Sequence, residues 1–114
     1  MITMDFVREI GRDMLSITNN EIEYDLNNGR REYGEYEWVW DNEDGSLSVW
    51  IKWEWSCNYE HVPANYIGAY MEHSDYYEPS KPKFDILDYY ATDGDRNRVE
   101  LSADDLQKIK DYVA

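Results

Sequence analysis

The sequence predicts an α+β fold, with a mainly antiparallel sheet of about five or six strands and an N-terminal and a C-terminal helix packed on one face. Two observations predict it. Apolar residues recur at helical spacing near both ends of the chain, whereas between the ends they alternate with polar residues in short runs. The length of 114 residues fits a single domain spanning residues 1–114.

The two helices are predicted from their apolar faces and caps. The first runs from Thr3 to about Ser16, and its apolar positions share one face: Phe6, Val7, Ile10 and Met14. The second follows Ser102, which is a good N-cap, and Leu101 can pack against Leu106 across that cap. Both helices therefore have an apolar face with which to cover a sheet.

Strands are predicted wherever apolar and polar residues alternate between turn signals. The segments are 21–26, 32–41, 46–55, 65–72, 84–91 and 98–101. Turns are expected at 27–29, 42–45 and 93–95, which are rich in Asn, Asp and Gly, because these residues tolerate turn conformations. Residues 73–83 contain two prolines and are predicted to form a long connection.

All the tryptophans lie in one predicted hairpin, residues 35–55, which reads EYEWVWDNEDGSLSVWIKWEW. Large aromatic residues at every second position are typical of sheet packing, so we expect Trp38, Trp53 and Trp55 in the core. Trp50 shares its face with polar residues and is expected to be partly exposed, as an interface anchor would be. Cys57 is the only cysteine and is interpreted as a small core residue.

The net charge of −14 restricts the partners of the protein. Binding to nucleic acid or to anionic lipid requires an excess of Lys and Arg, which this chain lacks. A basic protein partner is expected instead, with the chain itself a monomer or homodimer. The alternative is that the acidity only keeps an aromatic-rich protein soluble. Without a signal peptide or a long apolar run, a cytoplasmic location is expected, in the host cell if a phage encodes the chain.

The carboxylates are expected to form a regular pattern on the sheet. Acidic residues at every second position of a strand lie about 6.5 to 7 Å apart, and neighbouring strands about 5 Å apart. In a domain of about 35 Å diameter, the net charge gives about one charge per 2.5 Å, against about one per 1.7 Å along duplex DNA. The candidate partner-binding residues are Glu21, Glu23, Asp25, Tyr33, Glu35, Glu37, Asp41, Glu43, Asp44, Trp50 and Glu54.

These features lead to a functional hypothesis. In size, charge and aromatic content the chain resembles the small acidic inhibitors that phages use against restriction enzymes and CRISPR complexes. The resemblance implies a DNA mimic that docks on the nucleic-acid-binding surface of a nuclease, restriction enzyme or CRISPR effector. The alternative is an immunity protein that neutralises a basic nuclease toxin.

Catalytic and metal chemistry finds weaker support in the sequence. Residues 93–97 begin like a calcium loop, but Arg98 stands where that loop needs glycine. The spacing of Cys57 and His61 is not a zinc signature. We therefore expect neither an enzyme nor a cofactor. A small metal-binding protein or enzyme that uses His61 and His73 is kept as a second alternative.

Overall fold

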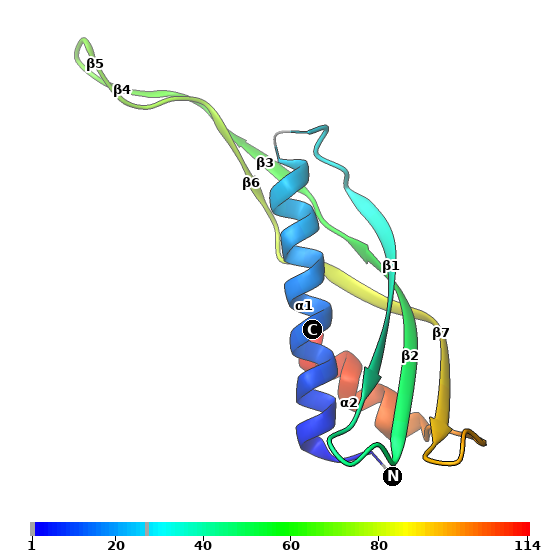
Figure 1. The fold of residues 1–114 in the computed structure, drawn as a ribbon. Helices are drawn as coiled ribbons and strands as arrows, with labels where there is room; N and C mark the ends of the chain where they lie inside the picture. Colours follow the sequence, from blue (N-terminus) through cyan, green and yellow to red (C-terminus); the bar gives the residue numbers. More distant parts are fainter. Residues whose placement is uncertain (1, 27) are drawn as a thin grey trace.

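The computed structural model describes residues 2–26 and 28–114. It has a helix at each end and antiparallel strands between them, which confirms the predicted α+β class (Figure 1). The elements in order are α1 (Met4–Asp25), β1 (Tyr33–Asp41), β2 (Leu47–Ser56), β3 (Tyr59–Val62), β4 (Asn65–Ile67), β5 (Tyr70–His73), β6 (Tyr76–Pro79), β7 (Lys83–Asp93), β8 (Arg98–Val99) and α2 (Ala103–Val113).

Four strands form the main sheet, in the order β1-β2-β7-β8. The predicted tryptophan-rich hairpin is confirmed: β1 and β2 pair antiparallel, with Glu35 opposite Glu54 and Trp40 opposite Val49. Strand β7 pairs with the other edge of β2, and the register shifts around Leu87, which has no partner on β2. Such a β-bulge places two residues opposite one and bends the strand. Both helices lie on the same face of this sheet (Figure 1).

Helix α1 is longer than predicted, and the strand expected at 21–26 is wrong because residues 21–25 belong to this helix. Thr18 appeared to end the apolar pattern, but it is buried, and its hydroxyl oxygen accepts a hydrogen bond of 3.1 Å from the indole of Trp53. Ile22 then continues the buried face at the next turn. The expected turn at 27–29 falls partly on Asn27, which lies outside the described residues.

The core lies between the helices and the sheet. Trp53 and Trp55 are buried as predicted, and so is Cys57. Trp38 is not a core residue, since 48% of it is exposed. It belongs to β1, an edge strand with a neighbour on only one side, so part of its indole lacks cover. The rings of Tyr36 and Trp40 instead pack on Trp53, at centroid distances of 5.6 and 6.1 Å.

The two helices cross closely at Gly11 of α1. A methyl group at this position would come within 2.3 Å of the ring of Tyr112 on α2, so glycine is what allows this ring to lie on α1. The predicted cap of α2 is confirmed, because the Ser102 hydroxyl accepts a hydrogen bond from the backbone of Asp105. Leu101 is buried beside this cap.

A long two-stranded arm projects from the body (Figure 1). Strands β3 and β6 form its base and β4 and β5 its tip, all antiparallel. The single strand predicted at 65–72 is wrong, because the chain reverses at Gly68, which has a φ of +63°. The connection predicted at 73–83 is wrong in part, since it contains β6. The arm makes the molecule elongated, with dimensions of 68 × 23 × 21 Å.

Candidate protein-interaction surface

The face of the main sheet that points away from the helices is the candidate interaction surface. Side chains alternate along β2: Val49, Ile51, Trp53 and Trp55 are buried under the helices. Trp50, Lys52 and Glu54 point to the other face and are half-buried. The strand pairing then determines which residues of β1 and β7 lie beside them.

Carboxylates occupy one half of this face. Glu35 and Asp85 flank Glu54, and in the next row Glu37 and Asp88 flank Lys52. Five acids thus surround one lysine, and the Lys52 ammonium lies 3.5 Å from a carboxylate oxygen of Glu35. We call Glu35, Glu37, Glu54, Asp85 and Asp88 the acidic sheet face. Neighbouring like charges destabilise a sheet, so the sheet itself gains nothing from this arrangement.

An apolar row borders the acidic sheet face. Val39, Trp50 and Tyr90 lie opposite one another on β1, β2 and β7. Trp50 is partly exposed as expected, and with Glu37, Trp38 and Val39 it lines a shallow hollow of about 330 Å³. An exposed aromatic hollow beside charged groups is typical of an interface anchor. Trp38 contributes to the rim of this hollow, although its partner on β2 is Ile51, so alternation puts its side chain on the helix-facing side of the edge strand.

The acids of the β1–β2 turn lie at the far end of the hairpin. Asp44 accepts a hydrogen bond of 2.9 Å from the backbone of Ser46, and its contacts with Ser46 hold its pKa below the ordinary value. Asp41 and Glu43 are exposed, and together with the first turns of α1 they line a broad groove of about 770 Å³. These three acids therefore extend the negative surface beyond the sheet.

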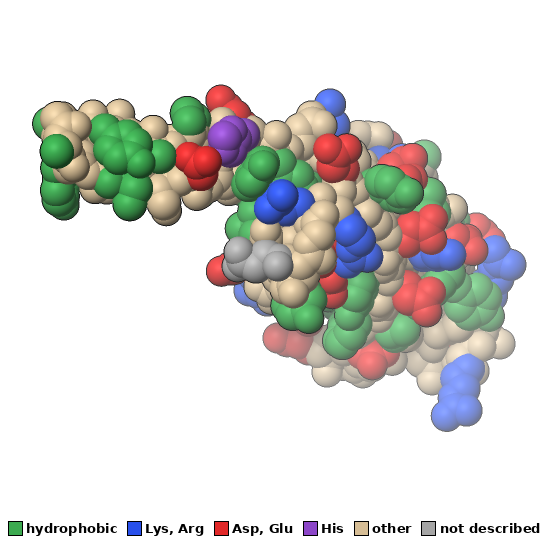
Figure 2. Space-filling view, turned by 90° about the horizontal axis from the view of Figure 1, so that it is seen from above, with side chains coloured by type: hydrophobic (Ala, Val, Ile, Leu, Met, Phe, Trp, Pro, Cys, Tyr) green, Lys and Arg blue, Asp and Glu red, His purple; other side chains and the backbone are tan. Residues whose placement is uncertain are grey.

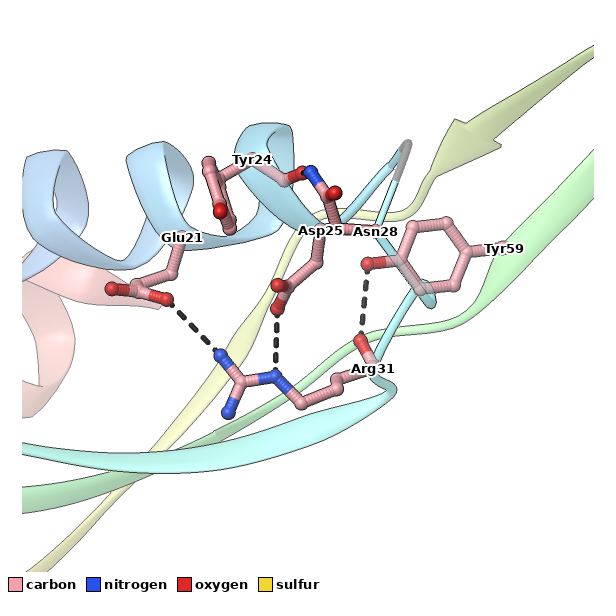
Figure 3. Close-up of polar contacts among 6 residues, drawn as sticks. All are labelled: Glu21, Tyr24, Asp25, Asn28, Arg31 and Tyr59. Carbon is pink, nitrogen blue, oxygen red and sulfur yellow. Dashed lines mark hydrogen bonds and ion pairs between the residues drawn. The ribbon is translucent and has the colours of Figure 1, made fainter.

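The expected acids of 21–25 lie on α1 and not on the sheet, and two of them have a structural role (Figure 3). Asp25 is buried, and its carboxylate accepts a 2.8 Å hydrogen bond from Arg31. A second nitrogen of the Arg31 guanidinium lies 3.1 Å from a carboxylate oxygen of Glu21. The bond to Asp25 raises the pKa of Arg31 above its ordinary value. Glu23 is exposed on the helix.

The same junction holds the base of the arm. The Tyr59 hydroxyl donates a 3.0 Å hydrogen bond to the carbonyl oxygen of Arg31 (Figure 3). Burial, followed by contact with Cys57, raises the pKa of Tyr59 to about 12. Burial also raises the pKa of the Cys57 thiol, which disfavours the reactive thiolate. Tyr33, an expected anchor, is exposed at the start of the edge strand β1.

The residues considered for metal or catalytic chemistry are dispersed. His61 lies 3.5 Å from Asp75 across the arm, while His73 contacts the carbonyl oxygen of Ser74. The carboxylate of Asp93 accepts hydrogen bonds from the backbone of Asp95 and Asn97 and so forms a turn. Within residues 2–26 and 28–114, no three His, Cys, Asp or Glu side chains are grouped to hold a metal ion.

Asp85 and Asp88 belong to the acidic sheet face but were missed from the sequence. They are three residues apart, so strict alternation places them on opposite faces. The bulge at Leu87 adds one residue and brings both to the same face. A β-bulge is hard to predict from a single sequence. The indication here is an acidic residue that falls at a position where alternation calls for an apolar one.

Comparison of the chain with protein-family models, curated proteins and solved structures gave no match. Over the described part of the chain, no helix combines the length and the apolar character needed to cross a membrane.

Proposed function

We propose that this protein is an inhibitor that binds a basic, nucleic-acid-handling protein, with the acidic sheet face in the place of nucleic acid. The observation that carries the proposal is the grouping of five carboxylates around Lys52 on the sheet face that the helices leave open. Because the molecule is elongated, its net charge is spread too thinly for the whole surface to match the charge density of DNA, so we restrict the proposed mimicry to the acidic sheet face. Over 68 Å the net charge of −14 amounts to about one charge per 5 Å, a third of the density along duplex DNA.

The apolar row gives the proposed contact a second component. Electrostatic attraction speeds encounter and selects a basic surface, but long-lived complexes depend on buried aromatic anchors. Trp50 and the hollow beside it lie next to the carboxylates, so a partner could cover both at once. Binding is therefore expected to be fast and salt-sensitive, and the apolar contact is expected to slow dissociation of the complex at low salt.

Two double charge reversals test the proposal. Glu35→Lys with Glu37→Lys alters the acidic sheet face. The matched control, Glu23→Lys with Asp111→Lys, changes the net charge equally on exposed helix positions. Both control residues lie near helix C-termini, where a positive charge is favourable. Tagged proteins are incubated with host-cell lysate, and partners released by high salt are identified by mass spectrometry and purified.

The decisive measurement is binding of the purified partner to a labelled DNA duplex, by gel shift, with increasing amounts of each variant. The wild type and the control pair are expected to displace the duplex. The Glu35 and Glu37 pair should need at least about 10-fold more protein, equivalent to the loss of one charged contact of about 1.4 kcal/mol. Equal displacement by both variants would show that the acidic sheet face is not the docking site. A partner that keeps its duplex would exclude mimicry.

A further inference from the structure

A further cavity lies at the end of the body away from the arm (Figure 1). It has a volume of about 330 Å³ and is enclosed by the β1–β2 turn, the β7–β8 turn and the first residues of α1 and α2. On the face of the body shown in Figure 2, acidic and basic side chains are mixed. The lining of this cavity, among the described residues, includes no Lys or Arg but four acids: Asp44, Asp93, Glu100 and Asp105. We call it the acidic cavity.

Asp105 distinguishes the acidic cavity from an ordinary cluster of surface acids. Only 4% of this residue is exposed. Its backbone N–H donates to the Ser102 hydroxyl, but its carboxylate has no hydrogen bond or ion pair with any described residue. In the described part of the chain, no side-chain oxygen is both sealed from open space and without a hydrogen-bond partner. Both carboxylate oxygens of Asp105 therefore reach open space, and the space beside this residue is the acidic cavity.

A cation in the cavity would stabilise this carboxylate. A charge held away from bulk water is costly unless an opposite charge or a hydrogen-bond donor replaces the water. Two of the other acids already have such partners: Asp44 is bonded to Ser46, and Glu100 lies 3.5 Å from Arg98. Asp93 uses one carboxylate oxygen for its own turn, which leaves the other oxygen without a partner among the described residues. Asp105 and then Asp93 thus gain most from a bound cation.

The rest of the lining indicates which kind of cation fits. Apolar residues from both helix-proximal strands and from α1 line the cavity, namely Phe6, Leu47, Val99 and Leu101. Apolar walls beside a carboxylate suit an aliphatic stem that ends in a charge. A metal ion needs several oxygen ligands around one point, and the described acids are not grouped in that way. The volume equals about eleven water-sized groups at about 30 Å³ each, which is ample for a diamine of about six heavy atoms.

We propose that the acidic cavity binds an aliphatic ammonium group, with the ammonium beside Asp105 and the carbon chain along the apolar lining. Two sources carry this chemistry: a small free diamine, and a lysine side chain of a protein that docks at this end of the body. The proposal does not depend on the proposed inhibitory function. The nearest glutamate of the acidic sheet face on β1, Glu37, lies five residues before Asn42 of the lining, which is about 17 Å along an extended chain.

An NMR titration of ¹⁵N-labelled protein with 1,4-diaminobutane at fixed ionic strength tests the site. Amide signals are expected to move at the start of α2 and in the two turns, and to saturate with a dissociation constant of about 1 mM or tighter. Asp105→Asn keeps the size of the side chain and should weaken binding at least about 10-fold, since it removes a charged hydrogen bond. Shifts spread over the whole acidic surface without saturation would show only a diffuse ion atmosphere and would overturn the proposal.

Two controls separate the cavity from the net charge. Asp111→Asn removes one charge at an exposed position of the same helix and should bind the diamine within about twofold of the wild type. Glu35→Lys with Glu37→Lys changes the net charge by four units, from −14 to −10, but leaves the cavity intact. If this pair weakened binding more than Asp105→Asn, the attraction would belong to the net charge.

A second site variant covers the case in which Asp105→Asn fails to fold. Asp93→Asn keeps the turn bonds through its amide oxygen and replaces the unpartnered oxygen, so it should weaken binding about 3-fold or more. Folded site variants that bind like the wild type would refute the site. Duplex displacement by these variants should equal that of the wild type, so failure of this inference and failure of the proposed function are distinguishable.

Further probes identify the source of the ammonium group. Nα-acetyl-lysine amide has one ammonium on a similar stem and stands for a lysine side chain. Equal affinity for both probes would assign the cavity to a lysine of a protein, whereas a diamine bound at least about 10-fold more tightly would assign it to a free diamine. Calcium chloride is the third probe. Tighter binding of Ca²⁺ than of either amine at the same residues would overturn the proposal.

Discussion

Arg31 connects three parts of the molecule through one side chain and one carbonyl group. Its guanidinium contacts Asp25 and Glu21 at the end of α1, and its carbonyl oxygen accepts the hydrogen bond from Tyr59 at the base of the arm. The Asp25 side chain is only 6% exposed, so the ion pair with Arg31 replaces the water that would otherwise stabilise its negative charge. A buried carboxylate that loses its cation pays the full cost of desolvation.

Replacement of Arg31 with Ala is therefore expected to lower the free energy of unfolding by about 1.5 to 3 kcal/mol, the usual range for a hydrogen bond to a charged group. Urea denaturation of the wild type and the variant measures this change in the free energy of unfolding. Arg12→Ala is the control, because Arg12 is an exposed arginine on α1, and a change within about 0.5 kcal/mol is expected there. If Asp25→Ala with Arg31→Ala were as unstable as Arg31→Ala alone, the unpaired carboxylate would not be the cause.

At the scale of elements, the close crossing of α1 and α2 depends on Gly11. Alanine at an interior helix position normally gains about 0.5 to 1 kcal/mol over glycine. Here the new methyl group would collide with the ring of Tyr112 at its first ring atoms, which cannot move without displacing the whole side chain. The clash should therefore outweigh the gain in helix propensity.

Gly11→Ala is expected to destabilise the protein by about 1 to 2 kcal/mol, the range for overpacking. A double-mutant cycle with Tyr112→Ala checks the cause, because without the ring the same Gly11→Ala change should become stabilising. Thermal or urea unfolding of the four proteins gives the coupling energy. Additive effects of the two substitutions would place the strain elsewhere.

The elements that could be predicted from sequence were those with strong local signals. The tryptophan-rich hairpin and the capped helix α2 follow from alternation, turn residues and Ser102. The end of α1 could not be predicted, because Ile22 and its polar neighbours fit both a helix and a strand, and the burial of Thr18 depends on Trp53 far along the chain. The arm was missed because it has no interior, so its sequence carries little alternation to read.

The candidate surface was predicted in part for the same reason. Glu35, Glu37 and Glu54 lie where alternation places them, since β1 and β2 pair without a bulge. Asp85 and Asp88 depend on the bulge around Leu87, and the partial exposure of Trp38 depends on the edge position of β1. Such features belong to the pairing of strands and not to any single segment.

At the scale of the whole molecule, the charge of −14 and the extended shape act together. A compact chain of this length has a radius of gyration of about 13 Å, whereas this molecule has 18.6 Å. The long arm adds length without adding a core. Mutual repulsion of the acids in the body opposes folding, and screening by salt relieves it.

Raising NaCl from about 0.05 to 0.5 M is therefore expected to raise the thermal midpoint by several degrees, because the Debye length falls from about 14 Å to about 4 Å. Calorimetry measures the shift at a fixed, low protein concentration. The Glu35→Lys and Glu37→Lys double variant has a net charge of −10 in place of −14. Its thermal midpoint should therefore rise less with salt. An equal shift in both proteins would assign the salt effect to something other than their acidity.

The absence of an interior in the arm has a consequence for how this protein can change over time. Substitutions in the body are constrained by packing around residues such as Trp53, whereas the core cluster includes no side chain from β4 or β5 at the tip of the arm. Mutations there can alter what the molecule associates with while leaving the stability of the body nearly unchanged. The arm is thus the part of the protein in which new binding specificity can evolve at the lowest cost to folding.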